Sequence, residues 1–267
     1  MEKNYLGKEQ CRERQIKILK AVCDICDDNS IPYYICFGTL LGAVRHKGYI
    51  PWDDDIDIVL FRKDYIKLKD LLMKQTKYEW LDYIDYEKEG YYYTFAKAVD
   101  NSTVAKQDDN KTIYGIWVDI FPLDNIPDDK TERNKFIKKL IRRRAVIMSM
   151  TTDFKAEKRI KHVFIKRILH FYSKFINKDK FLKNYLNLIE KYNNQDTKYV
   201  GLGFSSRICE GSLKKEWFKE RIDFEFENNL FKGPKEYDDL LKHLYGNYME
   251  LPPIDKRRDH KIIAWIK

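Results

Sequence analysis

Hydrophobic residues in the first 60 positions follow two different spacings. At 6–28 they recur at three- and four-residue steps, which predicts an opening helix. The apolar run at 33–37 predicts a short buried strand, 38–39 a turn, and 40–46 a short helix. Alternation between apolar and acidic residues at 56–60 predicts a second strand.

Further elements of both kinds are predicted downstream. A helix is expected at 64–74, and strands at the aromatic run 91–95 and at 116–121, the latter closed by Pro122. Residues 130–193 have helical spacing nearly throughout. This order predicts an α/β (α+β) fold, in which a small mixed β-sheet flanked by helices is followed by a mainly helical part.

Positive charge is concentrated where the mainly helical part begins, at residue 130. The net charge is +9, yet residues 130–183 alone contain 18 Lys/Arg against 4 Asp/Glu, so the remainder is net negative. We therefore expect residues 1–129 to form the catalytic core. Residues 130–267 are expected to form a helical basic region and a tail that pack back on the core and face an acceptor or a membrane.

The cysteines and the hydropathy of the chain indicate the cellular compartment of the protein. The five cysteines are scattered, and the polar N-terminus resembles no secretory signal, so we expect reduced thiols in a cytoplasmic protein. Cys23 and Cys26 share one helix face and are interpreted as core thiols rather than a zinc or redox pair. No apolar run approaches the ~20 residues that a membrane-spanning helix needs.

Asp55 and Asp57 stand two residues apart at the start of the 56–60 strand. Side chains two apart point to the same face of a strand, so the two carboxylates project together. Carboxylates this close repel each other unless a cation lies between them. Mg²⁺ or Mn²⁺ fits, because hard cations prefer oxygen ligands and also bind substrate phosphates. We expect both residues to be metal ligands and catalytic residues.

A third metal-binding carboxylate is expected from Asp119, on the apolar strand 116–121, where a charge is costly to bury without a partner. The alternative is a strand-end Asp bonded to the backbone, a role that Asp124 fits better. Gly38-Thr39, between a strand and a helix, allows backbone N–H groups to approach an anion. The order strand, Gly-Thr, short helix and Asp-x-Asp strand is what indicates a metal site.

These residues lead to a resemblance. Residues 34–57, with the runs Gly-Thr-Leu-Leu-Gly-Ala-Val-Arg-His and Pro-Trp-Asp-Asp-Asp-Ile-Asp, closely resemble the LicD family. These are bacterial phosphocholine transferases of the nucleotidyltransferase superfamily, related to animal fukutin-related protein. The resemblance continues at 117–124 and in the tail at 245–249 and 252–253. Residues 130–196 match only in their helical, basic character.

The resemblance implies a nucleotidyltransferase-like sheet flanked by helices and a Mg²⁺-dependent site. The donor would be CDP-choline or a similar CDP-linked compound. The acceptor would be a hydroxyl of a cell-surface glycan precursor (teichoic acid, capsule or lipopolysaccharide), which could be carried on a lipid, and CMP would be released. Asp55 and Asp57 match the family's metal-binding Asp-x-Asp, Asp119 its third acidic position, and Lys97 a family lysine. No nucleic-acid partner is implied.

In this interpretation the hydroxyl attacks the choline-bearing phosphorus in line and CMP leaves. Asp119 completes the metal shell or accepts the hydroxyl proton. Gly38 and Thr39 cradle the departing phosphate, and Lys97 or Arg45 neutralises its charge. Arg45 and His46 are placed among the substrate-binding residues; the alternative is that they are solvated helix-end residues favoured by the helix dipole.

Aromatic faces bind a trimethylammonium group. Trp52 is the substrate-binding candidate, and Tyr49 and residues 91–93 are further ones, with core packing as the alternative for each. The apolar face at 161–176 has two equally weighted interpretations. Either it lies in the interface of a membrane, which would place the protein peripherally on the inner face of the plasma membrane, or it packs on the core and shows a basic face to water.

Other functions use the same residues differently. A nucleotidyltransferase of the same superfamily, or a transferase acting on CDP-glycerol or CDP-ethanolamine, has the same metal chemistry and another donor. A non-catalytic binder of membranes or nucleic acid would use the basic residues alone. That last hypothesis leaves Asp55 and Asp57 unexplained.

Overall fold

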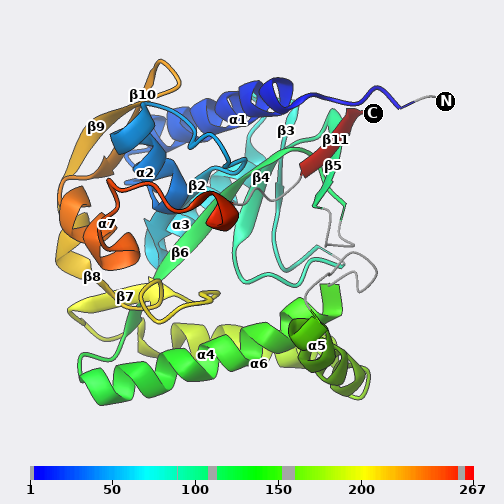
Figure 1. The fold of residues 1–267 in the computed structure, drawn as a ribbon, viewed down its shortest axis with the longest axis vertical. Helices are drawn as coiled ribbons and strands as arrows, with labels where there is room; N and C mark the ends of the chain where they lie inside the picture. The colour runs from blue at the N-terminus through cyan, green and yellow to red at the C-terminus, as the bar shows by residue number, and fades with distance from the viewer. Residues whose placement is uncertain (1–2, 89, 108–112, 152–159, 258–261) are drawn as a thin grey trace.

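The computed structural model describes residues 3–88, 90–107, 113–151, 160–257 and 262–267, and it is centred on one mixed β-sheet (Figure 1). The main path has the strand order β1-β2-β6-β4-β3, and β7 and β8 extend the sheet from β6. Only the β2–β6 pair is parallel. The strand bounds are β1 Tyr34–Ile35, β2 Asp57–Phe61, β3 Leu81–Ile84, β4 Ala96–Asp100, β6 Trp117–Ile126, β7 Tyr199–Leu202 and β8 Leu213–Lys214.

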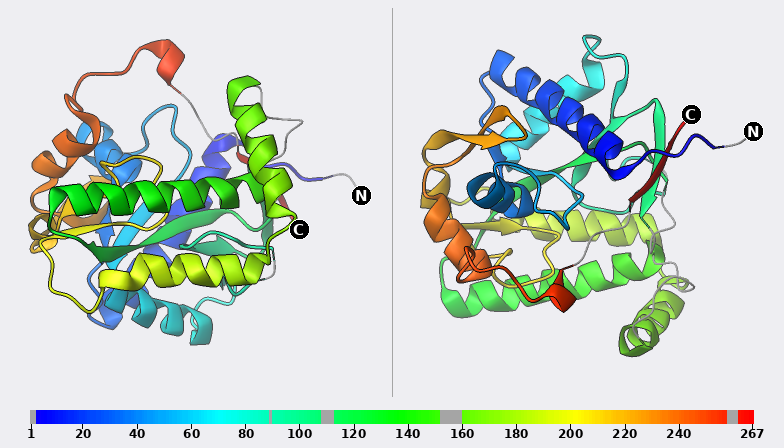
Figure 2. Two further views of the ribbon diagram at one scale, coloured as in Figure 1. Left: turned by 90° about the horizontal axis from the view of Figure 1, so that it is seen from below. Right: turned by 45° about the horizontal axis from the view of Figure 1, so that its top comes forward.

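Seven α-helices lie among the described residues. Helix α1 contacts β4 and β6, and α3 contacts β2, β3 and β6, so both pack on the sheet. Helices α4 and α6 run side by side, and α5 projects from the end of α4 (Figures 1 and 2). The helix bounds are α1 Lys8–Asp28, α2 Phe37–His46, α3 Arg62–Lys74, α4 Lys130–Thr151, α5 Ile160–Ser173, α6 Lys178–Ile189 and α7 Tyr237–Tyr245.

The C-terminal part returns to the front half of the chain. Strand β7 pairs with β6, and β11 (Ile262–Ile266) pairs with β5 (Thr103–Gln107). The hairpin of β9 (Arg221–Phe226) and β10 (Asn229–Pro234) contacts β1 and α2, and α7 contacts α2. Both ends of the chain lie together at one corner, where Tyr5 bridges to Trp265 (Figure 1).

The predicted fold class is confirmed, and most of the front-half elements lie where the hydrophobic pattern placed them. The aromatic run 91–95 is the exception, because it is a loop that leads into β4. Tyr91, Tyr93 and Phe95 are buried, and their rings contact one another in sequence order. Their β-prone composition therefore reflects burial rather than strand pairing.

Strand β6 also differs from the prediction, because it continues through Pro122 to Ile126. Its pairing with β4 ends at Ile120, and its pairing with β7 begins at Leu123. Pro122 thus lies between the two antiparallel ladders on that edge. A proline is tolerated there because neither ladder needs a backbone N–H from it.

Within the residues that the structure describes, the state of the cysteines and the character of the helices agree with the predictions. All five thiols are free, and Cys23 and Cys26 are buried on α1. Within the described residues, none of the helices combines the length and the apolar character that crossing a bilayer requires.

Asp124 has a structural role at the far end of β6. Its carboxylate accepts two hydrogen bonds from Arg62, Nε at 2.8 Å and Nη2 at 2.7 Å, and one from Asn193 Nδ2 at 2.7 Å. Asp124 is fully buried, and the pair joins α3 to the central strand. Bidentate geometry of this kind is the strong form of an ion pair.

We expect Asp124→Ala to lower the free energy of unfolding by about 3 kcal/mol, because it leaves the buried Arg62 guanidinium with only the half-exposed Glu190 carboxylate, whose Oε1 lies 3.6 Å from Arg62 Nη1. Urea unfolding measures the change. Asp196→Ala is the matched control, since the Asp196 side chain is 98 % exposed in its ion pair with Lys215. The control substitution should lower the free energy of unfolding by about 1 kcal/mol or less. Equal decreases in the two variants would contradict the structural role of Asp124.

Candidate active site

Two neighbouring parallel strands bring three carboxylates together. Asp57 opens β2 and pairs in register with Asp119 of β6, and Asp55 lies in the extended segment two residues before Asp57. One carboxylate oxygen of each residue lies within 4.8 Å of the other two. Asp55 and Asp57 are half-buried and Asp119 is buried. Three oxygen donors at this spacing fit a hard divalent cation, as predicted for Mg²⁺ or Mn²⁺.

Lys97 of β4 lies on the other side of Asp119. The two residues are paired in the β4–β6 register, and the Lys97 ammonium forms a buried ion pair with Asp119 Oδ1. The ammonium also lies 4.5 Å from the centre of the Trp117 ring, whose Nε1 donates to Asp119 Oδ2 at 3.3 Å. Lys97 is therefore engaged by the third carboxylate, and it faces aromatic rings rather than open solvent.

The charge state of Asp119 is set by opposing influences. Burial raises the pKa of this carboxyl, Lys97 and the Trp117 hydrogen bond lower it, and the negative charge of Asp55 raises it again. The net direction is upward. A nearby cation favours the ionised form, and Lys97 is the largest of the influences that lower this pKa.

The Gly38-Thr39 segment is helical, because α2 begins at Phe37 rather than at residue 40. Thr39 is buried, and its Oγ1 accepts a hydrogen bond of 2.8 Å from the backbone N–H of Asp57. A Cβ on Gly38 would come within 2.5 Å of Asp53 Oδ2. The start of α2 therefore positions Asp57 through Thr39 and lies against the Asp53 carboxylate through Gly38.

Helix α1 holds the acidic loop from behind. Arg12 Nη2 donates to the carbonyls of Ile50 and Asp53, at 3.3 and 2.9 Å, and Gln15 Nε2 donates to the carbonyl of Asp54 at 2.9 Å. Neither α1 residue was predicted to belong to the site. No local pattern marks them, because their importance comes from contacts made about 40 residues away along the chain.

Arg45 and His46 lie at the other end of α2. Seven residues of helix separate Arg45 from Gly38, which corresponds to about 10 Å along the axis. Arg45 Nη1 donates to the carbonyl of Tyr248 at 2.6 Å, and its Nε donates to His46 Nε2 at 2.9 Å. Burial and the Arg45 charge lower the pKa of His46, which favours its neutral form at pH 7. These two residues therefore lie at the opposite end of α2 from Gly38, where Arg45 is close enough to Arg257 and Tyr245 for their charges to affect its pKa, after the larger effect of burial.

The predicted aromatic candidates separate into two groups. Tyr49, Tyr91 and Tyr93 are buried, which supports core packing for all three. Trp52 is half-buried, and the Arg257 guanidinium lies 4.6 Å from the centre of its ring. The face of Trp52 thus already forms the kind of cation–π contact that a trimethylammonium group would need.

Sequence reasoning missed Tyr245, which lies near the acidic loop, and Arg207, which lies near Tyr245. Tyr245, at the end of α7, is close enough to Asp57 and Asp53 that their charges raise its pKa, after the larger effect of burial. The guanidinium of Arg207 lies 5.7 Å from the centre of the Tyr245 ring. Tyr245 lies in the tail segment that resembles the LicD family, whereas no sequence signal marks Arg207.

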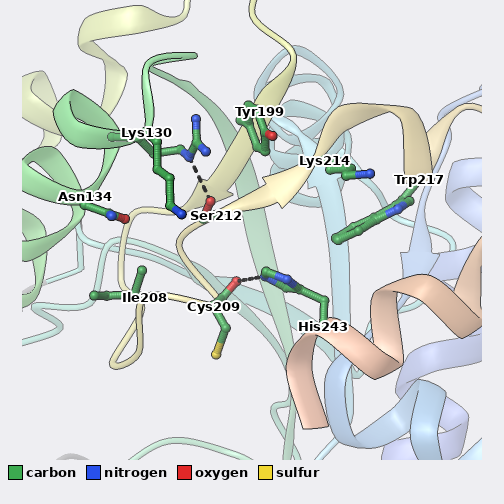
Figure 3. Close-up of a pocket in the computed structure, with 10 residues that line it drawn as sticks. Lys130, Asn134, Tyr199, Ile208, Cys209, Ser212, Lys214, Trp217 and His243 are labelled. Atoms are coloured by element: carbon green, nitrogen blue, oxygen red, sulfur yellow. Dashed lines mark hydrogen bonds between the residues drawn. The ribbon is translucent and has the colours of Figure 1, made fainter. Parts of the chain in front are cut away.

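A separate cavity of about 440 Å³ opens between the start of α4, β7, β8 and α7 (Figure 3). Lys130, Lys214, Trp217 and His243 point toward it. It contains none of the predicted site residues, and its neighbour β7 pairs with the far end of β6. Tyr199 in its lining pairs with Ile126, which is seven residues or about 23 Å of strand from Asp119, whereas Ile208, Cys209 and His243 in its lining are near neighbours in sequence of Arg207 and Tyr245.

Taken together, a small mixed sheet with three clustered carboxylates, flanked by helices, defines a nucleotidyltransferase-type domain. Residues 30–146 match the family model described as "LicD/FKTN/FKRP, nucleotidyltransferase domain", and this span contains every predicted site residue. Over 265 residues the chain is 30 % identical to the lipopolysaccharide cholinephosphotransferase LicD of Haemophilus influenzae, covering 96 % of this chain and 98 % of that protein.

A shorter match relates the chain to an uncharacterized protein of Rickettsia prowazekii, 37 % identical over 99 residues, or 37 % of this chain and 35 % of the other. The full-length similarity to the Haemophilus protein establishes the relationship. The chain belongs to the LicD family, and it is an enzyme of the phosphotransferase class.

The carboxylate cluster makes a direct prediction about metal binding. Saturating Mg²⁺ or Mn²⁺ should raise the Tm of the wild-type protein by about 5 to 10 °C, because a ligand that binds only the folded state stabilises it by mass action. Asp57→Asn should lose most of that rise in a thermal-shift measurement. Asp70→Asn, an exposed carboxylate on α3, is the control and should keep it. An undiminished rise in Asp57→Asn would contradict the ligand assignment.

Proposed function

We propose that the protein transfers phosphocholine from CDP-choline to a sugar hydroxyl of a cell-surface glycan precursor and releases CMP. The observation that carries the proposal is the cluster of Asp55, Asp57 and Asp119 in a chain that matches a cholinephosphotransferase over nearly its whole length. That relative is named for lipopolysaccharide, so we propose a lipopolysaccharide-type glycan as the first acceptor to test, before teichoic acid or capsule.

Asp55, Asp57 and Asp119 would hold Mg²⁺ or Mn²⁺, which when bound supplies electrostatic stabilisation of the phosphate oxygens. The acceptor hydroxyl oxygen forms a bond to the choline-bearing phosphorus and loses its proton to water, and the bond from that phosphorus to the bridging oxygen breaks in line, so that this oxygen leaves with CMP. Both Asp119 oxygens already accept hydrogen bonds, from Lys97 and Trp117. We therefore assign Asp119 to cation binding and Lys97 to keeping Asp119 ionised.

The leaving phosphate needs a positive partner. Lys97 is paired with Asp119, and Arg45 lies at the distant end of α2. Arg207 is half-exposed, and its guanidinium lies 5.7 Å from the ring centre of Tyr245, whose pKa responds to Asp57 and Asp53. Its Nε is paired with Glu210 Oε1 at 2.8 Å, so a phosphate would have to share or replace that partner. We therefore assign charge neutralisation on CMP to Arg207, with Trp52 as the aromatic candidate for the choline head group.

The donor is tested by isothermal titration with CDP-choline, CDP-ethanolamine, CDP-glycerol and CTP, each with and without Mg²⁺. We expect CDP-choline to bind most tightly and only with the metal present, and CMP to be released when a glycan acceptor is added. Asp57→Asn serves as the site-specific control. Preference for CTP would replace the proposal with nucleotidyl transfer, and preference for another CDP-linked donor would change the head group alone.

Arg207→Gln should lower kcat/KM for the donor by on the order of 10²-fold, because charge stabilisation of a transferring phosphoryl group carries effects of this size. Steady-state CMP release measures it. Lys214→Gln removes one exposed cation at the separate cavity and should leave kcat/KM within about twofold of wild type. Equal effects of the two substitutions would indicate a general loss of positive charge rather than a local role for Arg207.

A further inference from the structure

Helix α5 stands apart from the sheet at the end of α4 (Figures 1 and 2). One side of α5 faces α4, where His170 Nδ1 lies 3.0 Å from the carbonyl oxygen of Ser149. Ser173, on that same side, is buried, and its hydroxyl donates to the carbonyl of His170 at 2.7 Å. The side of α5 that carries His170 and Ser173, together with the half-buried Leu169, is therefore the side that packs against the protein.

The opposite side of α5 is apolar and exposed. We use "the α5 stripe" for five large side chains on the helix and the turn that follows it: Phe164, Ile168, Phe171, Tyr172 and Phe175. Their spacing places them on one helical face. Each is between 51 and 74 % exposed, and the rings of Phe171 and Phe175 lie 5.0 Å apart. A core-packing helix of a globular protein buries its apolar face, and α5 does the reverse.

Positive charge accompanies the stripe. Arg167 and Lys174 are exposed, and their seven-residue separation places them along one edge of the stripe. Residues 160–178 contain five Lys/Arg and no Asp or Glu. The segment is thus both apolar and cationic, without a carboxylate of its own to neutralise it.

We infer that the α5 stripe binds the surface of a bilayer that contains anionic lipid. The aromatic and aliphatic side chains enter the boundary between head groups and acyl chains, and Arg167 and Lys174 contact the lipid phosphates. Large apolar side chains bordered by Lys and Arg are the composition of helices that lie in this interface. A second copy of the chain fits poorly, because two segments with five positive charges each would repel.

This inference decides between the two interpretations that the sequence left open for residues 161–176. Of the apolar residues in that range whose side chains the structure describes, the five of the α5 stripe are exposed, and Leu169 and Ile176 are half-buried. It concerns where the enzyme works, and it rests on no assumption about donor, acceptor or metal. A failure of the proposed chemistry would leave it untouched, because vesicle binding is measured without turnover.

The test is co-sedimentation of the full-length protein with vesicles of phosphatidylcholine alone and of phosphatidylcholine with phosphatidylglycerol. We expect binding to the mixed vesicles. Phe171→Ser/Phe175→Ser should lower the apparent partition coefficient by at least about tenfold, because burial of each ring in an apolar phase is favourable. Leu230→Ser/Ile254→Ser is the matched control, since both side chains are equally exposed elsewhere on the surface, and it should bind like wild type.

Charge and chemistry are tested separately. Arg167→Gln/Lys174→Gln should weaken binding to the mixed vesicles about tenfold or more and have little effect on the neutral ones. Asp57→Asn, which disables the proposed metal site, should bind vesicles like wild type. The inference is overturned if wild type ignores anionic vesicles or if Phe171→Ser/Phe175→Ser still binds them. It is also overturned if that variant converts a stable dimer to a monomer while vesicles have no effect, because a second copy then covers the stripe.

Discussion

Electrostatic repulsion among three carboxylates is the constraint around which this fold is arranged. The parallel register of β2 with β6 places Asp57 beside Asp119, and Asp55 extends the cluster by two residues. Unit charges at this spacing repel by roughly 3 kcal/mol per pair at an effective dielectric constant of about 20. The antiparallel register of β4 with β6 brings Lys97 to the same position from the other side. Strand β6 therefore lies between the strand that brings a second carboxylate and the strand that brings the compensating ammonium, and the proposed cation would offset the remaining repulsion.

The cluster is held in place by residues that are remote from it in sequence. Helix α1 donates hydrogen bonds to the backbone of the acidic loop, and Thr39 fixes the backbone of Asp57 from the first turn of α2. The tail then supplies Tyr245 near Asp57 of the cluster and Asp53 of the acidic loop. Because these groups bind backbone atoms or surround the cluster, they restrict its geometry without adding further negative charge. A site built this way keeps its ligands in place before substrate arrives, which is the condition for electrostatic catalysis of phosphoryl transfer.

The sequence predicts what depends on local periodicity. The fold class, most front-half elements and the shared direction of Asp55 and Asp57 follow from strand and helix spacing, and Asp119 follows from the cost of a charge in an apolar strand. It does not predict what depends on register between distant strands. Lys97 was expected at the substrate, and its pairing with Asp119 is set by β4 and β6 lying side by side. Pro122 was expected to end a strand, and it is accommodated only because two partner strands meet there. The run 91–95 has strand composition, yet its rings are needed in the core.

Helix α5 is a second case in which the sequence predicts a local pattern but not a tertiary contact. Its apolar spacing is visible in the sequence, but spacing alone does not say which side of a helix meets the protein. The hydrogen bond from α5 to the carbonyl of Ser149 fixes that orientation and leaves the α5 stripe outside. Packing the stripe inward would break the His170 contact with Ser149 and turn Arg167 and Lys174 toward the core, where unpaired charge is costly. The helix therefore satisfies its polar side within the protein, and its apolar side requires a low-polarity environment from elsewhere. An anionic bilayer supplies that environment and at the same time neutralises the cations along its edge.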